Sequence, residues 1–234
     1  GDPRDAASWS QHYICHEDLP GAYDVAVSDY DGDGEMEIVA SSWVKGNMFA
    51  YFDRQDGEWV KSIVDEGVKE TRMVRAIDMN GNGRPDFIGT ASGSDLLAWY
   101  ENPGDPYNHT WPRHIIDTPK RPNKGQPVDM DGDGGLDLVM ALRGDDSVKG
   151  VLETPGAQIV WYERMGPDSW TKHVIADEFH YASEAVAADV DGDGQMEVVA
   201  TAWGANGRVA LFKHRGDPRG PWDMQILKSP WSKA

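Results

Sequence analysis

The sequence predicts an all-β protein, and three observations support this fold class. An acidic, glycine-rich turn occurs four times, beginning at Asp29, Asp78, Asp129 and Asp189, so the repeat is about 50 to 60 residues long. Short runs with alternating or continuous apolar character flank each turn, as expected of β-strands. Glycine, proline and tryptophan are abundant and long helical patterns are few. This composition is typical of many short strands joined by turns.

Each repeat contains the same succession of four expected strands. The first strand enters the acidic turn, the second leaves it, the third carries aromatic residues and the fourth begins at a tryptophan. A repeat of this length with four strands indicates a propeller blade, in which the aromatic residues fill the space between neighbouring sheets. The expected strands, in chain order, are 24–29, 36–43, 47–54, 59–64, 73–78, 85–92, 96–102, 111–116, 126–129, 136–143, 158–164, 170–175, 184–189, 196–203, 208–214 and 222–227.

The turn pattern, D-x-D-G-D-G-x-x-[DE] between the first and second strands, resembles that of the FG-GAP/VCBS family of integrin-like β-propellers. The resemblance extends from Asp24 to Leu227. It implies one propeller domain or propeller fragment over residues 1–234, with four-stranded blades at approximately 22–66, 72–118, 124–177 and 181–230. It indicates the fold more specifically than the function, because the family includes adhesion receptors, lectins and carbohydrate-active enzymes.

The N-terminal segment predicts one further strand. Residues Ser8–Asp18, SWSQHYICHED, resemble the fourth strand of a blade, and the preceding GDPR recurs at Gly216–Arg219. We therefore expect the N-terminus to belong to a fifth, incomplete blade. On this interpretation either a longer chain or a second subunit supplies the missing blades. A closed four-bladed ring with a surplus strand is the alternative.

The acidic turns predict metal sites. In the first turn, aspartates alternate with glycines that let the backbone curl, and one more carboxylate follows four residues later, so about five or six oxygens converge. No helical pattern follows, which argues against an EF-hand. Turns one, three and four are expected to bind calcium, because a shell built almost wholly from protein oxygens suits that ion better than magnesium. The expected ligands, side-chain or main-chain, are Asp29, Asp31, Asp33, Glu35, Glu37, Asp129, Asp131, Asp133, Gly135, Asp137, Asp189, Asp191, Asp193, Gln195 and Glu197.

The second turn has fewer charges. Asn80 and Asn82 replace two aspartates, so only Asp78 and Asp86 remain ionised, and Arg84 stands where the other turns supply their main-chain carbonyl ligand. Fewer formal charges weaken cation binding, so this fourth calcium site is expected to be the weakest. In all four turns the expected role of calcium is structural, not catalytic.

Composition limits the classes of partner. The net charge of −18 argues against nucleic acid and against an anionic membrane surface, since both would be repelled. No run approaches the length of a membrane-spanning helix, and no signal-peptide pattern opens the sequence. Cys15 is the single cysteine, which excludes an intrachain disulfide. The missing signal-peptide pattern leaves a cytosolic protein or one that is already processed, and we expect a secreted protein, extracellular or periplasmic.

Strand order predicts a ligand surface on the face opposite the acidic turns. The loops that leave the second and fourth strands meet there, and they carry aromatic and cationic residues. Tryptophan can stack on the apolar face of a sugar ring, and arginine can pair with a uronate carboxylate. The expected ligand-binding residues are Tyr23, Trp43, Arg72, Lys124, Arg143, His180 and Trp203.

The sequence therefore leads to a hypothesis with alternatives left open. The first is a calcium-stabilised extracellular propeller that binds carbohydrate, with acidic polysaccharide as the expected ligand. The second is a polysaccharide lyase or sugar dehydratase acting on uronate-containing glycans, in which His180, His16, Tyr23, Arg72 and Arg143 would be the catalytic candidates. The third is a protein-adhesion module. No compact hydrolase or zinc-protease motif is present in the sequence.

Overall fold

The computed structural model describes residues 4, 9–15, 19–43, 47–145, 153–204 and 207–230. Within these residues the fold is all-β, as predicted, and the helical part is a single 3₁₀ turn, η2 (Ser92–Ser94). Strands with apolar residues on alternate positions or throughout pair with their sequence neighbours, as the short apolar runs and intervening turns require. No helix in the described part of the chain has the length and apolar character needed to cross a bilayer.

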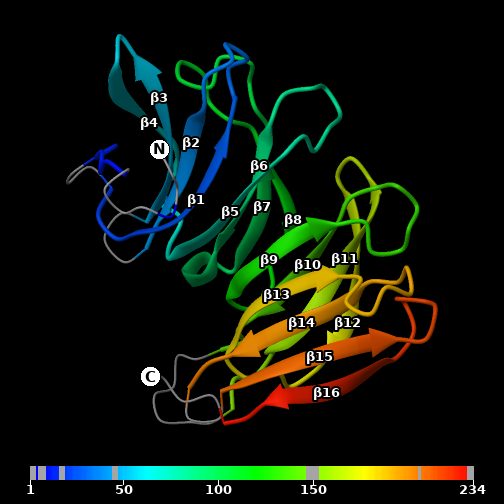
Figure 1. The fold of residues 1–234 in the computed structure, drawn as a ribbon. Coiled ribbons are helices and arrows are strands. Elements are labelled where there is room, and N and C mark those ends of the chain that lie inside the picture. The colour runs from blue at the N-terminus through cyan, green and yellow to red at the C-terminus, as the bar shows by residue number, and fades with distance from the viewer. Residues whose placement is uncertain are drawn as a thin grey trace.

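Sixteen strands form four consecutive antiparallel units of four strands each (Figure 1). Unit 1 contains β1 (Ala22–Ser28), β2 (Glu37–Ser42), β3 (Met48–Gln55) and β4 (Glu58–Glu66). Unit 2 contains β5 (Thr71–Ile77), β6 (Asp86–Ala91), β7 (Leu96–Tyr100) and β8 (Arg113–Asp117). Unit 3 contains β9 (Pro122–Val128), β10 (Asp137–Leu142), β11 (Gln158–Gly166) and β12 (Ser169–Ala176). Unit 4 contains β13 (Ala182–Ala188), β14 (Glu197–Ala202), β15 (Arg208–His214) and β16 (Trp222–Lys228).

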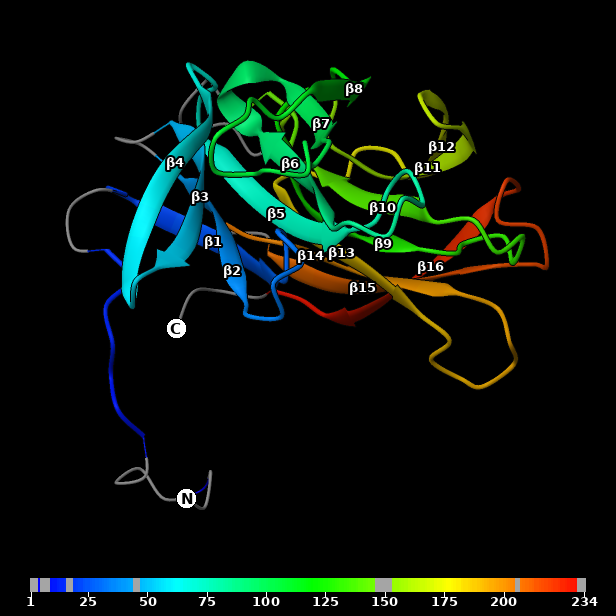
Figure 2. The ribbon, with the colours of Figure 1, turned by 90° about the horizontal axis from the view of Figure 1, so that it is seen from above.

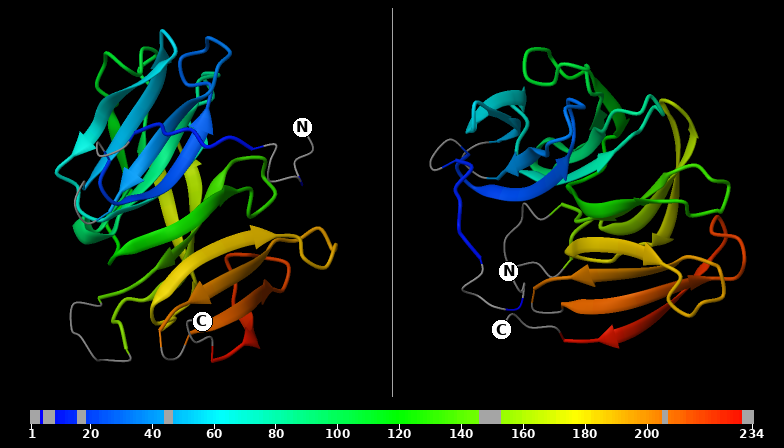
Figure 3. Two further views of the ribbon diagram at one scale, coloured as in Figure 1. Left: turned by 60° about the vertical axis from the view of Figure 1, so that its left-hand side comes forward. Right: turned by 45° about the horizontal axis from the view of Figure 1, so that its top comes forward.

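The four units follow one another along a curve (Figure 3), and the hydrophobic core lies between them. One cluster, which includes Phe49 and Phe87, joins units 1 and 2. A second, which includes Trp99 and Tyr162, joins units 2 and 3, and a third, which includes Trp161 and Phe212, joins units 3 and 4. The aromatic third strands therefore form the core, as the sequence predicts. A single parallel bridge between Glu184 and Lys124 also connects the inner strands of units 3 and 4 into one eight-stranded sheet.

Among the described residues, none of the hydrophobic clusters joins unit 4 to unit 1, so the closed four-bladed ring, the alternative to an incomplete propeller, is not observed. One finer expectation about the architecture is not met. The expected extra strand at Ser8–Asp18 is absent from its described part, because residues 9–15 pair with no strand and run outside the sheets (Figure 2). Ser8 and residues 16–18 lie outside the described residues. The end of this segment packs on unit 1 through Cys15 and Leu19, which contact the cluster around Phe52.

Candidate functional site

The first aspartate of each acidic turn shapes the turn. Both carboxylate oxygens of Asp29 accept backbone hydrogen bonds, from Gly32 N at 2.8 Å and from Gly34 N at 3.1 Å. Both glycines have positive φ, which lets the chain fold back over the carboxylate. Asp78, Asp129 and Asp189 accept the corresponding bonds in the other turns. The repeated sequence therefore gives a repeated local structure.

Three of the four turns gather acidic side chains closely enough to hold a metal ion. Ligand atoms of Asp29, Asp31 and Asp33 lie within 4.8 Å of one another, and so do those of the groups in turns three and four. The members of those two groups are Asp129, Asp131 and Asp137, and Asp189, Asp191 and Glu197. These are the three turns in which the sequence predicts the stronger sites. At the second turn, which the structure describes completely, no such group is found.

The last carboxylate of each turn is buried at the start of the second strand. Glu37 accepts a 2.7 Å hydrogen bond from Tyr30 N, and Asp137 accepts bonds from Met130 N and Arg164 N. Burial raises the pKa of Glu37 to about 7 and that of Asp137 to about 6, with the neighbouring carboxylates adding to the shift. Negative charge is thus concentrated where the hydrogen bonds of the turn do not fully compensate it.

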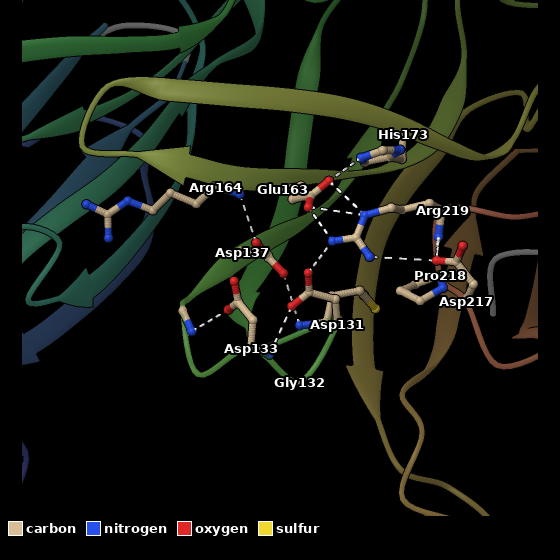
Figure 4. Close-up of polar contacts among 12 residues, drawn as sticks. Asp131, Gly132, Asp133, Asp137, Glu163, Arg164, His173, Asp217, Pro218 and Arg219 are labelled. Atoms are coloured by element: carbon tan, nitrogen blue, oxygen red, sulfur yellow. Dashed lines mark hydrogen bonds and ion pairs between the residues drawn. The ribbon is translucent and has the colours of Figure 1, made fainter.

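A basic side chain from unit 4 contacts the third turn (Figure 4). Arg219, in the loop between β15 and β16, forms ion pairs with Asp131 and with Glu163 of β11. Glu163 also contacts His173 Nε2 at 2.8 Å. The hydrogen bonds that Arg219 donates to Glu163 lower the pKa of the Glu163 carboxyl and raise the pKa of the Arg219 guanidinium. The guanidinium therefore neutralises part of the third acidic group and links units 3 and 4.

The fourth turn contains a basic side chain of its own unit. Lys213 of β15 forms an ion pair with Asp191, and its Nζ lies 3.6 Å from Glu197 Oε1. Its hydrogen bond to Asp191 raises the pKa of Lys213. By sequence alignment of the third strands, Lys213 corresponds to Asp53, Glu101 and Glu163 in the other units. The position beside the turn is therefore acidic in three units and basic in one.

The predicted ligand residues lie at the ends of the first and second strands of the units that are away from the acidic turns. Their contacts fall into two groups. In the first, which we call the Arg72 cluster, the guanidinium carbon lies 4.6 Å from the ring centroid of Trp43 and 5.2 Å from that of Tyr23. Lys124 Nζ lies 4.9 Å from the Tyr23 ring. Arg72 itself is only 6% exposed and donates to Glu70 Oε2 at 3.3 Å. Its guanidinium supports the two aromatic rings and is not presented to solvent.

The second group, the Trp203 cluster, lies in units 3 and 4. The guanidinium carbon of Arg143 lies 5.2 Å from the Trp203 ring, and Tyr181 packs edge-on against the same ring with centroids 5.9 Å apart. His180 Nδ1 accepts a hydrogen bond from Thr154 N at 3.1 Å and lines a separate cavity of about 310 Å³. The lyase candidate His16 lies outside the described residues.

One backbone feature places these aromatic residues and was not predicted. Trp43 N donates to Gly21 O at 2.7 Å, and Trp203 N donates to Tyr181 O at 3.3 Å. Ser92 and Arg143 make the same bond to Glu70 and Arg121 in the other two units. The four acceptor residues all have positive φ, and three of them are not glycine. Because glycine is the residue that usually marks a positive φ, the sequence gives little signal for this hydrogen-bonded turn.

Carboxylates on the first strand of a unit, or in the loop just before it, were also missed as partners of the predicted cations. Asp24 Oδ2 pairs with Arg75 Nη1 at 2.7 Å, and Asp24 Oδ1 lies 3.7 Å from Lys124 Nζ. Glu70 bridges Arg72 and Arg121, at 3.3 and 2.6 Å. The positive charge expected on this face is therefore largely paired within the protein. The signal in the sequence was the presence of charged residues within otherwise apolar first strands.

Part of the chain matches a known repeat family, and most of the chain has a distant similarity to a solved structure. A family model described as the FG-GAP-like repeat matches residues 78–140, which include the second and third acidic turns. The family recognised from the turn pattern is thus confirmed for this segment. Among solved structures, the crystal structure of the V. cholerae biofilm matrix protein Bap1 is 16% identical with a TM-score of 0.46. That match covers 92% of this chain but 40% of the other chain. The comparison with curated proteins gives no match.

Proposed function

We propose that the acidic turns bind calcium and that the ion stabilises the fold. The donor set supports this, because turns one, three and four each gather three carboxylates on a glycine-rich loop. Burial raises the pKa of Glu37, the charges of Asp31 and Asp33 add to the shift, and a divalent cation would neutralise this group of carboxylates. The second turn, with two asparagines in place of aspartates, is the weakest candidate.

The four turns are expected to differ in affinity because Lys213 already neutralises part of the fourth. Changing Lys213 to Gln removes a cation paired with Asp191 and near Glu197, so calcium affinity at that turn should rise about tenfold, equivalent to about 1.4 kcal/mol. Calorimetric calcium titration of both proteins measures this. Lys172→Gln, an exposed lysine on β12, is the control and should leave all affinities unchanged. If the titration of Lys213→Gln matches that of the unmodified protein, Lys213 does not lower the calcium affinity of the fourth turn and the prediction is wrong.

We further propose that the protein binds carbohydrate with the surface formed by the Arg72 and Trp203 clusters. The observation that supports this most is the exposure of two tryptophans, 37% for Trp43 and 41% for Trp203, each against a guanidinium. An exposed indole ring held in one orientation can stack on a pyranose ring at little entropic cost. Lys124 and Arg143 favour a glycan with carboxylates, although both have partners within the protein.

The test is a binding assay on immobilised neutral and uronate-containing polysaccharides. Trp43→Ala and Trp203→Ala should each weaken retention about tenfold, because the stacking surface is lost. Trp9→Ala is the control, since that tryptophan is also exposed but lies outside both clusters. Unchanged retention of both cluster variants contradicts the proposal. Tighter binding to uronate polymers than to neutral ones, lost at high salt, would support the acidic ligand.

The same samples address the lyase alternative. A lyase would raise ultraviolet absorbance through new double bonds, and His180→Ala would abolish the rise. Its candidate groups do not form one observed cluster, because His180 lines the cavity with Glu153 and Thr154 whereas Arg72 is buried against Trp43. We also propose an extracellular location, and further units that come from a longer chain or from a second subunit. The open succession of units supports the presence of further units, because no described core cluster joins unit 4 to unit 1.

A further inference from the structure

Two loops of the chain share a Gly-Asp-Pro triplet and the same local structure. They join the third and fourth strands of unit 2, at residues 104–106, and of unit 4, at residues 216–218. In the first, Trp111 Nε1 donates to Pro106 O at 3.0 Å, and in the second, Trp222 Nε1 donates to Pro218 O, also at 3.0 Å. The triplet therefore makes the same contact with the tryptophan that follows it in both loops, and the two triplets can be compared with each other.

Each loop packs on the acidic turn of the preceding unit, but the residue after the triplet differs. In unit 4 it is Arg219, which pairs with Asp131 and Glu163 of unit 3 (Figure 4). In unit 2 it is Tyr107, which packs against the core cluster of units 1 and 2. The same loop is held on unit 1 by Asn102, whose Nδ2 donates to Tyr30 O at 2.7 Å.

A cavity of about 420 Å³ lies between the unit 2 loop and unit 1. Among the residues that line it, Asp31 and Asp53 correspond to Asp131 and Glu163, the two partners of Arg219. Asp105 adds a third carboxylate at the rim, although it already accepts bonds from Asn108 within its loop. The carboxylates that hold the guanidinium between units 3 and 4 thus have counterparts here.

Among the described residues, none that lines this cavity is basic. His109 lies beside it, with Nδ1 3.4 Å from Asp105 Oδ2, and the Arg84 guanidinium lies beside Gly104. Neither side chain lines the cavity itself. The cavity wall therefore carries negative charge without the cation that balances it in the equivalent place.

The Tyr51 hydroxyl is a second, independent indication of a ligand. Tyr51 lines the cavity, its side chain is 0% exposed, and its hydroxyl has no hydrogen-bond partner among the residues that the structure describes. The corresponding residue of unit 3 is Trp161, whose Nε1 donates to Pro218 O at 3.2 Å and whose ring lies 5.9 Å from the Arg219 guanidinium. A buried hydroxyl without a partner is costly, so an occupant that hydrogen-bonds to it is favoured.

We propose that the cavity between units 1 and 2 binds a guanidinium group, the head of an arginine side chain, supplied by another molecule. The planar fork of a guanidinium can donate to Asp53 and Asp31 together, as Arg219 does to Glu163 and Asp131. The Tyr51 hydroxyl then accepts a further hydrogen bond or donates to a carboxylate that the ligand orients. The cavity has the size of small-ligand sites in proteins.

The proposal is tested by calorimetric titration with N-acetyl-arginine amide, using N-acetyl-citrulline amide as the neutral isostere. One saturable site for the arginine compound and none for the citrulline compound is the expected result. The Asp53→Asn variant should weaken binding at least about tenfold, because one charge-assisted partner is lost. Asp56→Asn, in the exposed turn three residues further on, is the matched control and should bind like the unmodified protein.

A second variant compares the cavity between units 1 and 2 directly with the Arg219 site between units 3 and 4. Arg219→Gln leaves Asp131 and Glu163 without their guanidinium, so the arginine compound should then bind at two sites in place of one. Titrations are run in calcium and in chelator, and the unit 1 site should persist in both. Equal binding of the citrulline compound, full binding by a folded Asp53→Asn variant, or loss of binding whenever calcium is present would each overturn the proposal.

Discussion

Calcium is expected to raise the melting temperature of the protein by roughly 5 to 10 °C for each site that it occupies, when it is present at about a hundred times its dissociation constant. An ion that binds the folded state alone contributes about 2.7 kcal/mol per site at that concentration. For a chain of this size 1 kcal/mol shifts the melting temperature by about 2 to 4 °C. The measurement is a thermal melt in chelator, repeated after calcium is restored.

The ligands are tested by variants with an internal control. Asp29→Asn removes a carboxylate from the first acidic group, whereas Asp56→Asn changes an exposed hairpin residue outside it. Only the first variant should reduce the stabilisation by calcium. The second turn provides a further check, because Asp78→Asn should lower the calcium-dependent part of the stability least. Identical melting curves with and without chelator, together with no metal by elemental analysis, would show that the turns do not bind an ion.

The elements that could be predicted from sequence are those specified by local chemistry. Alternating apolar residues predict the strands, and the spacing of Asp29, Asp31 and Asp33 predicts the group that the structure gathers. The aromatic residues of the third strands are found in the core, because a strand flanked by two neighbouring sheets is buried on both faces. In each case the information lies within about ten residues of chain, so a single repeat is enough to interpret it.

The parts that were missed depend on contacts between distant residues. Arg219 and Asp131 are 88 positions apart, and the GDPR segment that contains Arg219 was interpreted only as the approach to a strand. Arg72 was expected to face a ligand, but Glu70 and the rings of Trp43 and Tyr23 enclose it. A charged residue in a strand can be a ligand group or half of an internal ion pair, and only the placement of its partner distinguishes these two roles.

The N-terminal segment shows the same limit. Its sequence is similar to a fourth strand, yet residues 9–15 form no ladder in the described structure. A strand requires a neighbour with free backbone groups as well as an apolar pattern. In unit 1 the fourth-strand position is already taken by β4, which pairs with β3 along its whole length. Similarity of sequence therefore could not establish that this segment is a strand.

Gly125→Ala is expected to destabilise the protein by about 3 kcal/mol, the upper part of the range for overpacking a buried site. Gly125 lies in β9, and a Cβ there would stand 1.9 Å from Val139 O and 2.5 Å from Met140 Sδ. The obstructing oxygen belongs to the backbone of β10, so the strand pair must separate to admit the methyl group. Gly166→Ala, where the nearest atom would be 3.9 Å away, should change stability little.

The same variant should also weaken the ligand surface. Gly125 N contacts Met73 Sδ of unit 2 at 3.1 Å, and the preceding residue, Lys124, lies over the Tyr23 ring and near Asp24. Displacement of β9 therefore moves Lys124 away from the Arg72 cluster while the acidic turns keep their local hydrogen bonds. We expect a melting temperature lower by roughly 6 to 12 °C, a calcium stoichiometry that is unchanged, and reduced retention on polysaccharide. A stable Gly125→Ala protein with normal retention would contradict this prediction, because it would show that β9 and β10 separate at no cost.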